Sequence, residues 1–179
     1  MNRPFDAHTV RALLDELVRR LGERGVRGGI RIAGGAAMLL RFPNDPAVRV
    51  TRDIDALVEP ADEVLAVVAE MADELGLLPG WLNSAGSGWF RVDVAASDDE
   101  VHVAVATARE LVAMKLAAGR DKDFADLVVL ARHLGITHPE ELVRIAYDVY
   151  GNDAVELPDG RDSYLWYAES VIAEVNRAN

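Results

Sequence analysis

Two glycines, Gly34 and Gly35, separate two short apolar runs, and this junction constrains the chain more than any other part of it. The preceding run, residues 30–33, has the composition of a buried strand, and the following run, residues 36–40, that of a helix. Because glycine carries no side chain, the backbone N–H groups and the positive end of the helix dipole can approach an anion closely at such a turn. The junction therefore predicts a strand-to-helix turn that holds a phosphate.

Two aspartates follow the turn in the alternating segment 53–58. The alternation predicts a strand with Asp53 and Asp55 on one face, their Cβ atoms roughly 7 Å apart. Like charges at that distance are unfavourable unless a cation lies beside them, and Mg²⁺ prefers carboxylate oxygens together with phosphate oxygens. The pair therefore predicts a Mg²⁺ site that takes a nucleoside triphosphate.

These motifs resemble the nucleotidyltransferase fold, in which a helix-opening Gly-Gly or Gly-Ser precedes Asp-x-Asp on a strand. Later segments are similar to the small nucleotidyltransferase toxins of bacterial AbiE/MenT-like type IV toxin–antitoxin pairs; they are residues 81–83, 108–116 and 120–127. The resemblance covers roughly residues 28–150. It becomes fairly specific where the glycine pair and Asp-x-Asp occur together with Lys115 and Asp126.

The resemblance implies an α/β (α+β) nucleotidyltransferase fold, with a small mixed sheet, flanking helices and a helical C-terminal part. It implies Mg²⁺-dependent transfer of a nucleotide from CTP or UTP to the 3′ end of a tRNA, which would block translation, and a separate cognate antitoxin protein. Asp53 and Asp55 would hold the Mg²⁺, whereas Gly34, Gly35 and Thr51 would fix the phosphates.

Lys115 is one of two lysines in the chain and lies in a helix that begins with a capping box, Thr107-x-x-Glu110. Helical spacing places it within the apolar face, where an ammonium group needs an anion. The resemblance makes this anion a triphosphate oxygen, whose charge Lys115 offsets during transfer. The alternative is a partner carboxylate, Asp123 or Asp126, and the two interpretations are compatible.

The next helix, residues 121–134, is predicted to end at Gly135, with Asp123 close to its apolar stripe and Asp126 at its polar edge. The resemblance assigns to Asp126 the acid that orients or deprotonates the attacking hydroxyl, and to Asp123 a second, nucleotide-binding acid. Without the resemblance, an aspartate near a helix start is more often a cap or a dipole partner. Whether Asp93, on a later predicted strand, is a third catalytic carboxylate stays open.

Length and composition favour one domain, with an α/β core over about residues 1–106 and a helical part over about residues 107–179. The absence of cysteine excludes disulfides, zinc–thiolate sites and thiol nucleophiles. The N-terminus lacks the pattern of a secretory leader, and no apolar stretch approaches the length of a membrane span. We therefore expect a cytoplasmic protein with no membrane partner.

The net charge of −11 is unevenly distributed. Residues 1–60 contain ten arginines and eight acids, whereas residues 61–179 contain nine basic residues and twenty-two acids. Arginines that flank the predicted site favour a nucleic-acid acceptor, and the equally weighted alternative is that they keep the surface soluble. The acidic remainder leaves two other functions open: adenylylation of a protein hydroxyl, and a non-catalytic module that binds a nucleotide or a partner.

Capping and turn signals delimit the other elements. They predict an N-terminal helix capped by Asp6 and a helix that stops at Gly76. The remaining predictions are a turn at Gly28-Gly29, a mobile loop over the cleft at residues 84–88, a hairpin from strands at residues 90–94 and 101–105, a helix capped by Thr137 and a last helix over about residues 163–175.

Overall fold

The protein divides into two compact units, Met1–Ala106 and Thr107–Asn179, which we describe one at a time. The structure is a computed structural model, and it describes residues 3–84, 86–90 and 100–178. The division falls where the sequence places the change from α/β core to helices. That the two units form a single domain stays a prediction.

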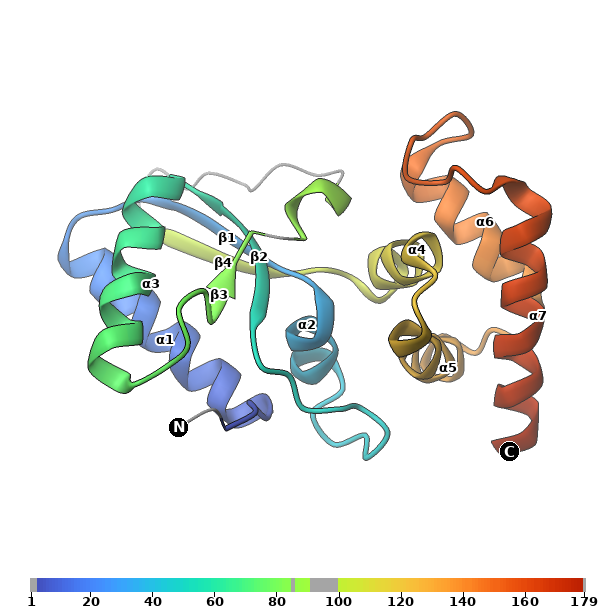
Figure 1. Ribbon diagram of the computed structural model, residues 1–179, viewed down its shortest axis with the longest axis horizontal. Coiled ribbons are helices and arrows are strands. Elements are labelled where there is room, and N and C mark those ends of the chain that lie inside the picture. The colour runs from blue at the N-terminus through green and yellow to red at the C-terminus, as the bar shows by residue number, and fades with distance from the viewer. Residues whose placement is uncertain (1–2, 85, 91–99, 179) are drawn as a thin grey trace. The chain divides into compact units, whose positions relative to one another are not determined.

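The N-terminal unit combines helices with a four-stranded sheet (Figure 1). Its elements are α1 (Ala7–Glu23), β1 (Gly28–Ile32), α2 (Gly34–Arg41), β2 (Ile54–Glu59), α3 (Ala61–Leu75), β3 (Leu82–Asn83), a short 3₁₀ helix η1 (Ser87–Trp89) and β4 (Val101–Val105). The strand order is β3-β2-β1-β4, with β1 and β2 antiparallel and the other two neighbouring pairs parallel. Helices α1 and α3 pack side by side against this sheet. The mixed α/β class predicted from the sequence is confirmed.

Local capping signals delimit two helices of this unit as predicted. The side chain of Asp6 accepts a hydrogen bond of 2.8 Å from the backbone N–H of Thr9 and so caps α1. Helix α3 ends at Gly76, which takes the left-handed conformation with φ +63°. Both helices bury their apolar stripes, which is why periodicity alone located them.

Two sequence predictions about the strands change in the structure. Gly28 and Gly29 form the start of β1 and not the turn before it. A Cβ atom on Gly28 would lie 1.9 Å from the carbonyl oxygen of Glu59 on the neighbouring strand, so the close approach of the backbones requires glycine here. The second strand of the predicted hairpin is β4, while residues 91–99, which contain its first strand and its turn, lie outside the described residues.

The C-terminal unit is helical, and its central helix is buried on all sides. Its elements are α4 (Ala108–Ala118), α5 (Asp121–Leu134), α6 (Pro139–Tyr150) and α7 (Gly160–Ala178). Helix α4 begins with the predicted capping box, because Thr107 and Glu110 exchange side-chain and backbone hydrogen bonds. Six consecutive residues of α4, Leu111 to Leu116, are buried, since α5, α6 and α7 all pack against it. A helix surrounded in this way is apolar nearly all round.

The last two helices differ from the predictions at their ends. Helix α6 has His138 and not Thr137 at its N-cap position, and the Thr137 hydroxyl instead forms a hydrogen bond of 2.9 Å with Nδ1 of His138. Helix α7 begins at Gly160 and is longer than the predicted range. Among the described residues, no helix combines the length and the apolar character that a membrane crossing requires.

Candidate functional site

The turn between β1 and α2 packs directly onto Asp55. Gly34 opens α2 with φ +60°, and a Cβ atom built on it would lie 2.2 Å from Oδ2 of Asp55. The N-cap residue, Ala33, has no side-chain oxygen that could cap the first turn of the helix. The aspartate carboxylate therefore lies at the positive end of α2, against a position that only glycine can occupy.

Asp55 is held on two sides. Its backbone oxygen accepts a hydrogen bond of 2.8 Å from the N–H of Ala33, and on the other edge of β2 it is in register with Asn83 of β3. A Cβ atom on Gly86 would lie 3.3 Å from the Cβ atom of Asp55, so the segment after β3 covers this residue. Sequence reasoning assigned no role to Gly86, although the glycine-rich segment 84–88 was predicted to form a loop over the cleft.

Asp53 lies just outside the strand, which corrects the prediction that both aspartates alternate along it. Strand β2 begins at Ile54, and Asp53 occupies the bend before it. The Thr51 hydroxyl donates a hydrogen bond either to the backbone oxygen of Asp53 at 3.1 Å or to its Oδ1 at 3.3 Å. Thr51 also lies close to Gly35, since a Cβ atom there would be 3.1 Å from the Thr51 hydroxyl oxygen.

A backbone bridge to the N-terminal segment explains why the strand starts late. Phe5 and Thr51 exchange two backbone hydrogen bonds, of 2.6 and 3.0 Å, and Phe5 is buried. The bridge holds Thr51 against residues that are 46 positions away in sequence, so the chain bends before it joins the sheet. Nothing in the pattern around Asp53 indicates this long-range pairing, and Phe5 was not among the predicted site residues.

The two carboxylates fit a Mg²⁺ ion that also takes oxygen ligands from a substrate. Mg²⁺ in phosphoryl-transfer sites is bound by one or two carboxylates plus phosphate oxygens and water. Within the described part of the chain, no cluster of three or more acidic, histidine or cysteine side chains is arranged to hold a metal. Asp93, the candidate for a third carboxylate, lies outside the described residues. The N-terminal unit therefore supplies two carboxylates near the turn that opens α2, whose positive end would suit an anion.

The C-terminal unit contains a buried ion cluster centred on Lys115. Its ammonium nitrogen lies 2.6 Å from Oδ2 of Asp126 and 3.2 Å from Oδ1 of Asp123. All three side chains are almost completely buried, with exposed fractions of 5%, 6% and 1% for Lys115, Asp126 and Asp123. The carboxylate partners considered in the sequence interpretation are thus both present. A buried ammonium needs such partners, because isolated charges in the protein interior are strongly unfavourable.

Arg120 completes this cluster, and sequence reasoning did not assign it a role. Its Nε atom donates a hydrogen bond of 2.6 Å to Oδ2 of Asp123. Burial alone raises the pKa of the Asp123 carboxyl, but the hydrogen bond from Arg120 and the charge of Lys115 outweigh it, so the pKa lies below the ordinary value of 3.8. Asp123 is therefore a carboxylate at neutral pH.

The burial of Asp126 corrects its predicted place on α5. The apolar pattern placed Asp126 at the polar edge of the helix, yet it is buried beside Leu127 and Leu130, while Leu134 is 38% exposed. The buried face of α5 includes both aspartates, which there form ion pairs with Lys115 of α4. Polar partners, and not hydrophobicity alone, select this face.

The predicted site residues thus form two groups, each within its own unit. The N-terminal unit brings together Gly34, Gly35, Thr51, Asp53 and Asp55. The C-terminal unit brings together Lys115, Asp123 and Asp126. The chain matches no protein-family model, no curated protein and no solved structure.

Proposed function

We propose that the protein is a Mg²⁺-dependent nucleotidyltransferase that moves a nucleoside monophosphate from a triphosphate to a hydroxyl acceptor. In the form we favour, CTP or UTP is the donor and the 3′ end of a tRNA is the acceptor, so that the modified tRNA no longer supports translation. A toxin of this kind would have a cognate antitoxin protein as its partner.

The observation that carries the proposal is the contact between Asp55 and the Gly34 turn. It sets a carboxylate suited to Mg²⁺ against the N-terminus of α2, which is suited to phosphate. A nucleoside triphosphate with its Mg²⁺ presents both kinds of group within a few ångströms.

The reaction would proceed by direct displacement at the α-phosphate. The acceptor oxygen forms a bond to the α-phosphorus, the bond from phosphorus to the bridging oxygen breaks, pyrophosphate leaves, and the hydroxyl proton passes to a base. When bound, Mg²⁺ supplies charge stabilisation for the phosphate oxygens. Asp53 and Asp55 would hold it, and the N–H groups at Gly34 and Gly35 would orient the triphosphate.

The cluster in the C-terminal unit enters the proposal through the sequence resemblance. Lys115 would offset charge on the leaving group, Asp123 would contribute to nucleotide binding, and Asp126 would orient or deprotonate the attacking hydroxyl. Asp126 Oδ2 already lies 2.6 Å from the Lys115 ammonium, so the two proposed roles fall on one pair of side chains. Substitutions in this cluster need stability controls, because the same three side chains are buried.

The test is transfer of label from each of the four α-³²P-labelled nucleoside triphosphates to total tRNA in the presence of Mg²⁺. Asp55→Asn keeps the size of the side chain and removes its charge, and Asp73→Asn does the same at an exposed aspartate of α3 as the matched control. We expect label on tRNA with the wild type and Asp73→Asn, and a loss of at least about 100-fold with Asp55→Asn. Circular dichroism would verify that both variants fold.

The other outcomes would replace parts of the proposal. Label on the protein itself or on added protein, but not on tRNA, would favour adenylylation or a related modification of a protein hydroxyl. The acidic composition of residues 61–179 also suits a protein acceptor. No label on any acceptor with any triphosphate, from a folded protein, would overturn the transferase and leave a nucleotide- or partner-binding module.

A further inference from the structure

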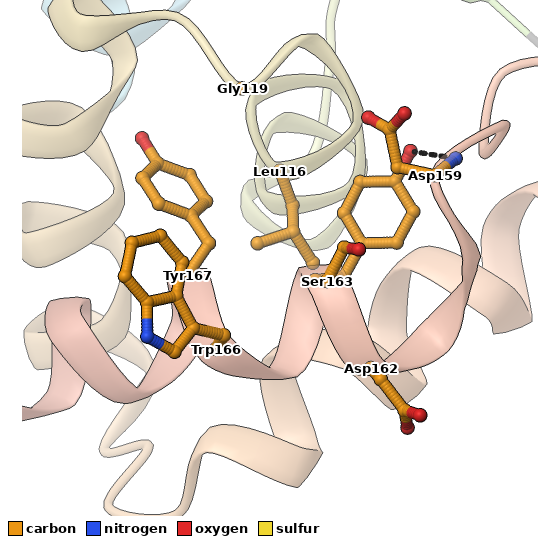
Figure 2. Close-up of a pocket in the computed structure, with 8 residues that line it drawn as sticks. Leu116, Gly119, Asp159, Asp162, Ser163, Trp166 and Tyr167 are labelled. Carbon is orange, nitrogen blue, oxygen red and sulfur yellow. Dashed lines mark hydrogen bonds between the residues drawn. The ribbon is translucent and has the colours of Figure 1, made fainter.

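The C-terminal unit contains a cavity of about 620 Å³ that the proposed reaction does not use. It lies between the end of α4 and the first turns of α7 (Figure 2). Its walls are formed by Leu116, Gly119, Asp159, Asp162, Ser163, Tyr164, Trp166 and Tyr167. A volume of this size is typical of sites that take a small molecule or a segment of a partner.

Aromatic side chains form one wall of this cavity. Trp166 is 72% exposed, and Figure 2 shows its ring beside Tyr167, with Leu116 next to them. The Tyr167 ring packs against Phe124 at a centroid distance of 6.1 Å in a tilted arrangement. Tyr164 is buried, and its hydroxyl accepts a long hydrogen bond of 3.5 Å from the backbone N–H of Asp159. The wall thus presents an exposed indole next to a packed tyrosine ring.

The charged groups of the cavity are all negative. Asp159 and Asp162 lie at its edges, and none of the described residues that line it is basic. Neither carboxylate forms an ion pair with a described residue. The two carboxylates oppose the positive end of α7 and so disfavour phosphates and other anions, whereas a cation gains both from the carboxylates and from the negative face of an indole ring.

We propose that this cavity binds the guanidinium group of an arginine side chain from a partner protein. Guanidinium is planar, stacks on aromatic faces and makes paired hydrogen bonds to carboxylates, so it suits a cavity lined by an exposed indole and by aspartates better than a compact ammonium does. The C-terminal unit carries thirteen acidic and eight basic residues, which favours a partner with a basic surface. The cavity is also larger than a guanidinium needs, which leaves room for the neighbouring backbone of the partner.

The test is NMR titration of the ¹⁵N-labelled full chain with the capped peptide N-acetyl-Gly-Arg-Gly-amide. Three tryptophan indole N–H signals are expected, and Trp166→Leu identifies the one from Trp166. We expect saturable shifts of that signal with the arginine peptide, weaker binding with lysine in its place, and none with citrulline, the neutral analogue of arginine. Because no nucleotide takes part, this result is independent of the proposed reaction.

Matched variants show whether the named groups bind the peptide. We expect Trp166→Leu to weaken peptide binding about fivefold, the factor that one cation–π contact provides. Because this variant lacks the Trp166 signal, its binding is monitored through the backbone amide shifts of α7. The double variant Asp159→Asn with Asp162→Asn should weaken it further, and Asp153→Asn, at an exposed aspartate outside the cavity, should not.

Several results would overturn the proposal. One is equal binding of the citrulline and arginine peptides, and another is unchanged affinity in the double aspartate variant. Methylguanidinium that binds as tightly as the peptide would point to a small cation and not to a partner protein. Cytidine or uridine that shifts the Trp166 signal where the arginine peptide does not would make the cavity a nucleobase site.

Discussion

Gly34→Ala tests the contact on which the proposed site rests. The substitution adds one methyl group at a position with φ +60°, where it meets Oδ2 of Asp55 at 2.2 Å. Gly76→Ala is the matched control in the same unit, because Gly76 has φ +63° and nothing within 4 Å of its added Cβ atom. The two variants share the backbone strain and differ in the clash.

The structure sets the size of each effect. Alanine in the left-handed conformation costs about 1 kcal/mol, and both variants should lose that much free energy of unfolding. In Gly34→Ala, the carboxylate oxygen of Asp55 must also move by about 1.2 Å to reach 3.4 Å, the lower limit of ordinary contact. Overpacking of this kind adds about 1 to 3 kcal/mol, and a displacement of about 1 Å at a reacting group lowers the rate roughly 100-fold.

Urea unfolding followed by circular dichroism measures the first effect, and transfer of label from the preferred triphosphate measures the second. We expect Gly76→Ala to retain nearly full transfer activity and Gly34→Ala to lose about 100-fold at a temperature where both are folded. Equal stability and equal activity in the two variants would refute the reasoning, because the contact between Asp55 and Gly34 would then have no consequence.

Three further predictions concern the C-terminal unit. Lys115→Met leaves two buried carboxylates without their ammonium, so it should lower the free energy of unfolding in urea by about 3 kcal/mol. The control Lys122→Met, at the exposed lysine, should lower it by less than about 0.5 kcal/mol. Similar losses in the two variants would contradict the ion pairing of Lys115. The depressed pKa of Asp123 stabilises the fold above the unfolded-state pKa of about 3.9, and this contribution is lost as pH falls through the folded-state pKa. The difference in free energy of unfolding between wild type and Asp123→Asn, measured by urea titration, should therefore narrow below pH 3.8. A difference that stays constant with pH would be the contrary result. Tyr167→Phe removes a buried hydroxyl that has no hydrogen-bond partner among the described residues. Thermal and urea unfolding should therefore show unchanged or higher stability. A loss of more than about 1 kcal/mol in the free energy of unfolding would instead reveal a hydrogen bond made by that hydroxyl.

The sequence predicts the parts of the fold that depend on neighbours in the chain. The cap at Asp6, the capping box at Thr107 and the stop at Gly76 each depend on residues within one helical turn, and each is confirmed. The mixed α/β class follows from the same local periodicities. The contact of Gly34 with Asp55 is of another kind: the sequence predicts its two halves as separate motifs, and only the pairing of β1 with β2 brings them together.

The sequence predictions are wrong where a distant partner decides. The bend at Asp53 is set by the bridge from Phe5 to Thr51, and no local pattern records that pairing. The burial of Asp126 depends on Lys115, eleven residues away on another helix, and a calculation that counts only apolar residues places this aspartate at a polar edge. In both cases hydrogen bonds between distant segments override the local pattern.

The unlike environments of Asp53 and Asp55 suggest how two carboxylates would suffice for the proposed Mg²⁺. Asp55 is fixed by its strand pairing and by glycines on two sides, so it can set the position of an ion. Asp53 lies in an exposed bend, where the Thr51 hydroxyl can donate a hydrogen bond to its backbone oxygen or to its Oδ1, so its side chain is less confined than that of Asp55. Mg²⁺ demands nearly ideal octahedral geometry, which one rigid and one adaptable ligand can meet more readily than two rigid ones. When its hydroxyl donates to Oδ1, Thr51 would orient the Asp53 carboxylate, a role separate from the phosphate contact that the sequence resemblance assigns to it.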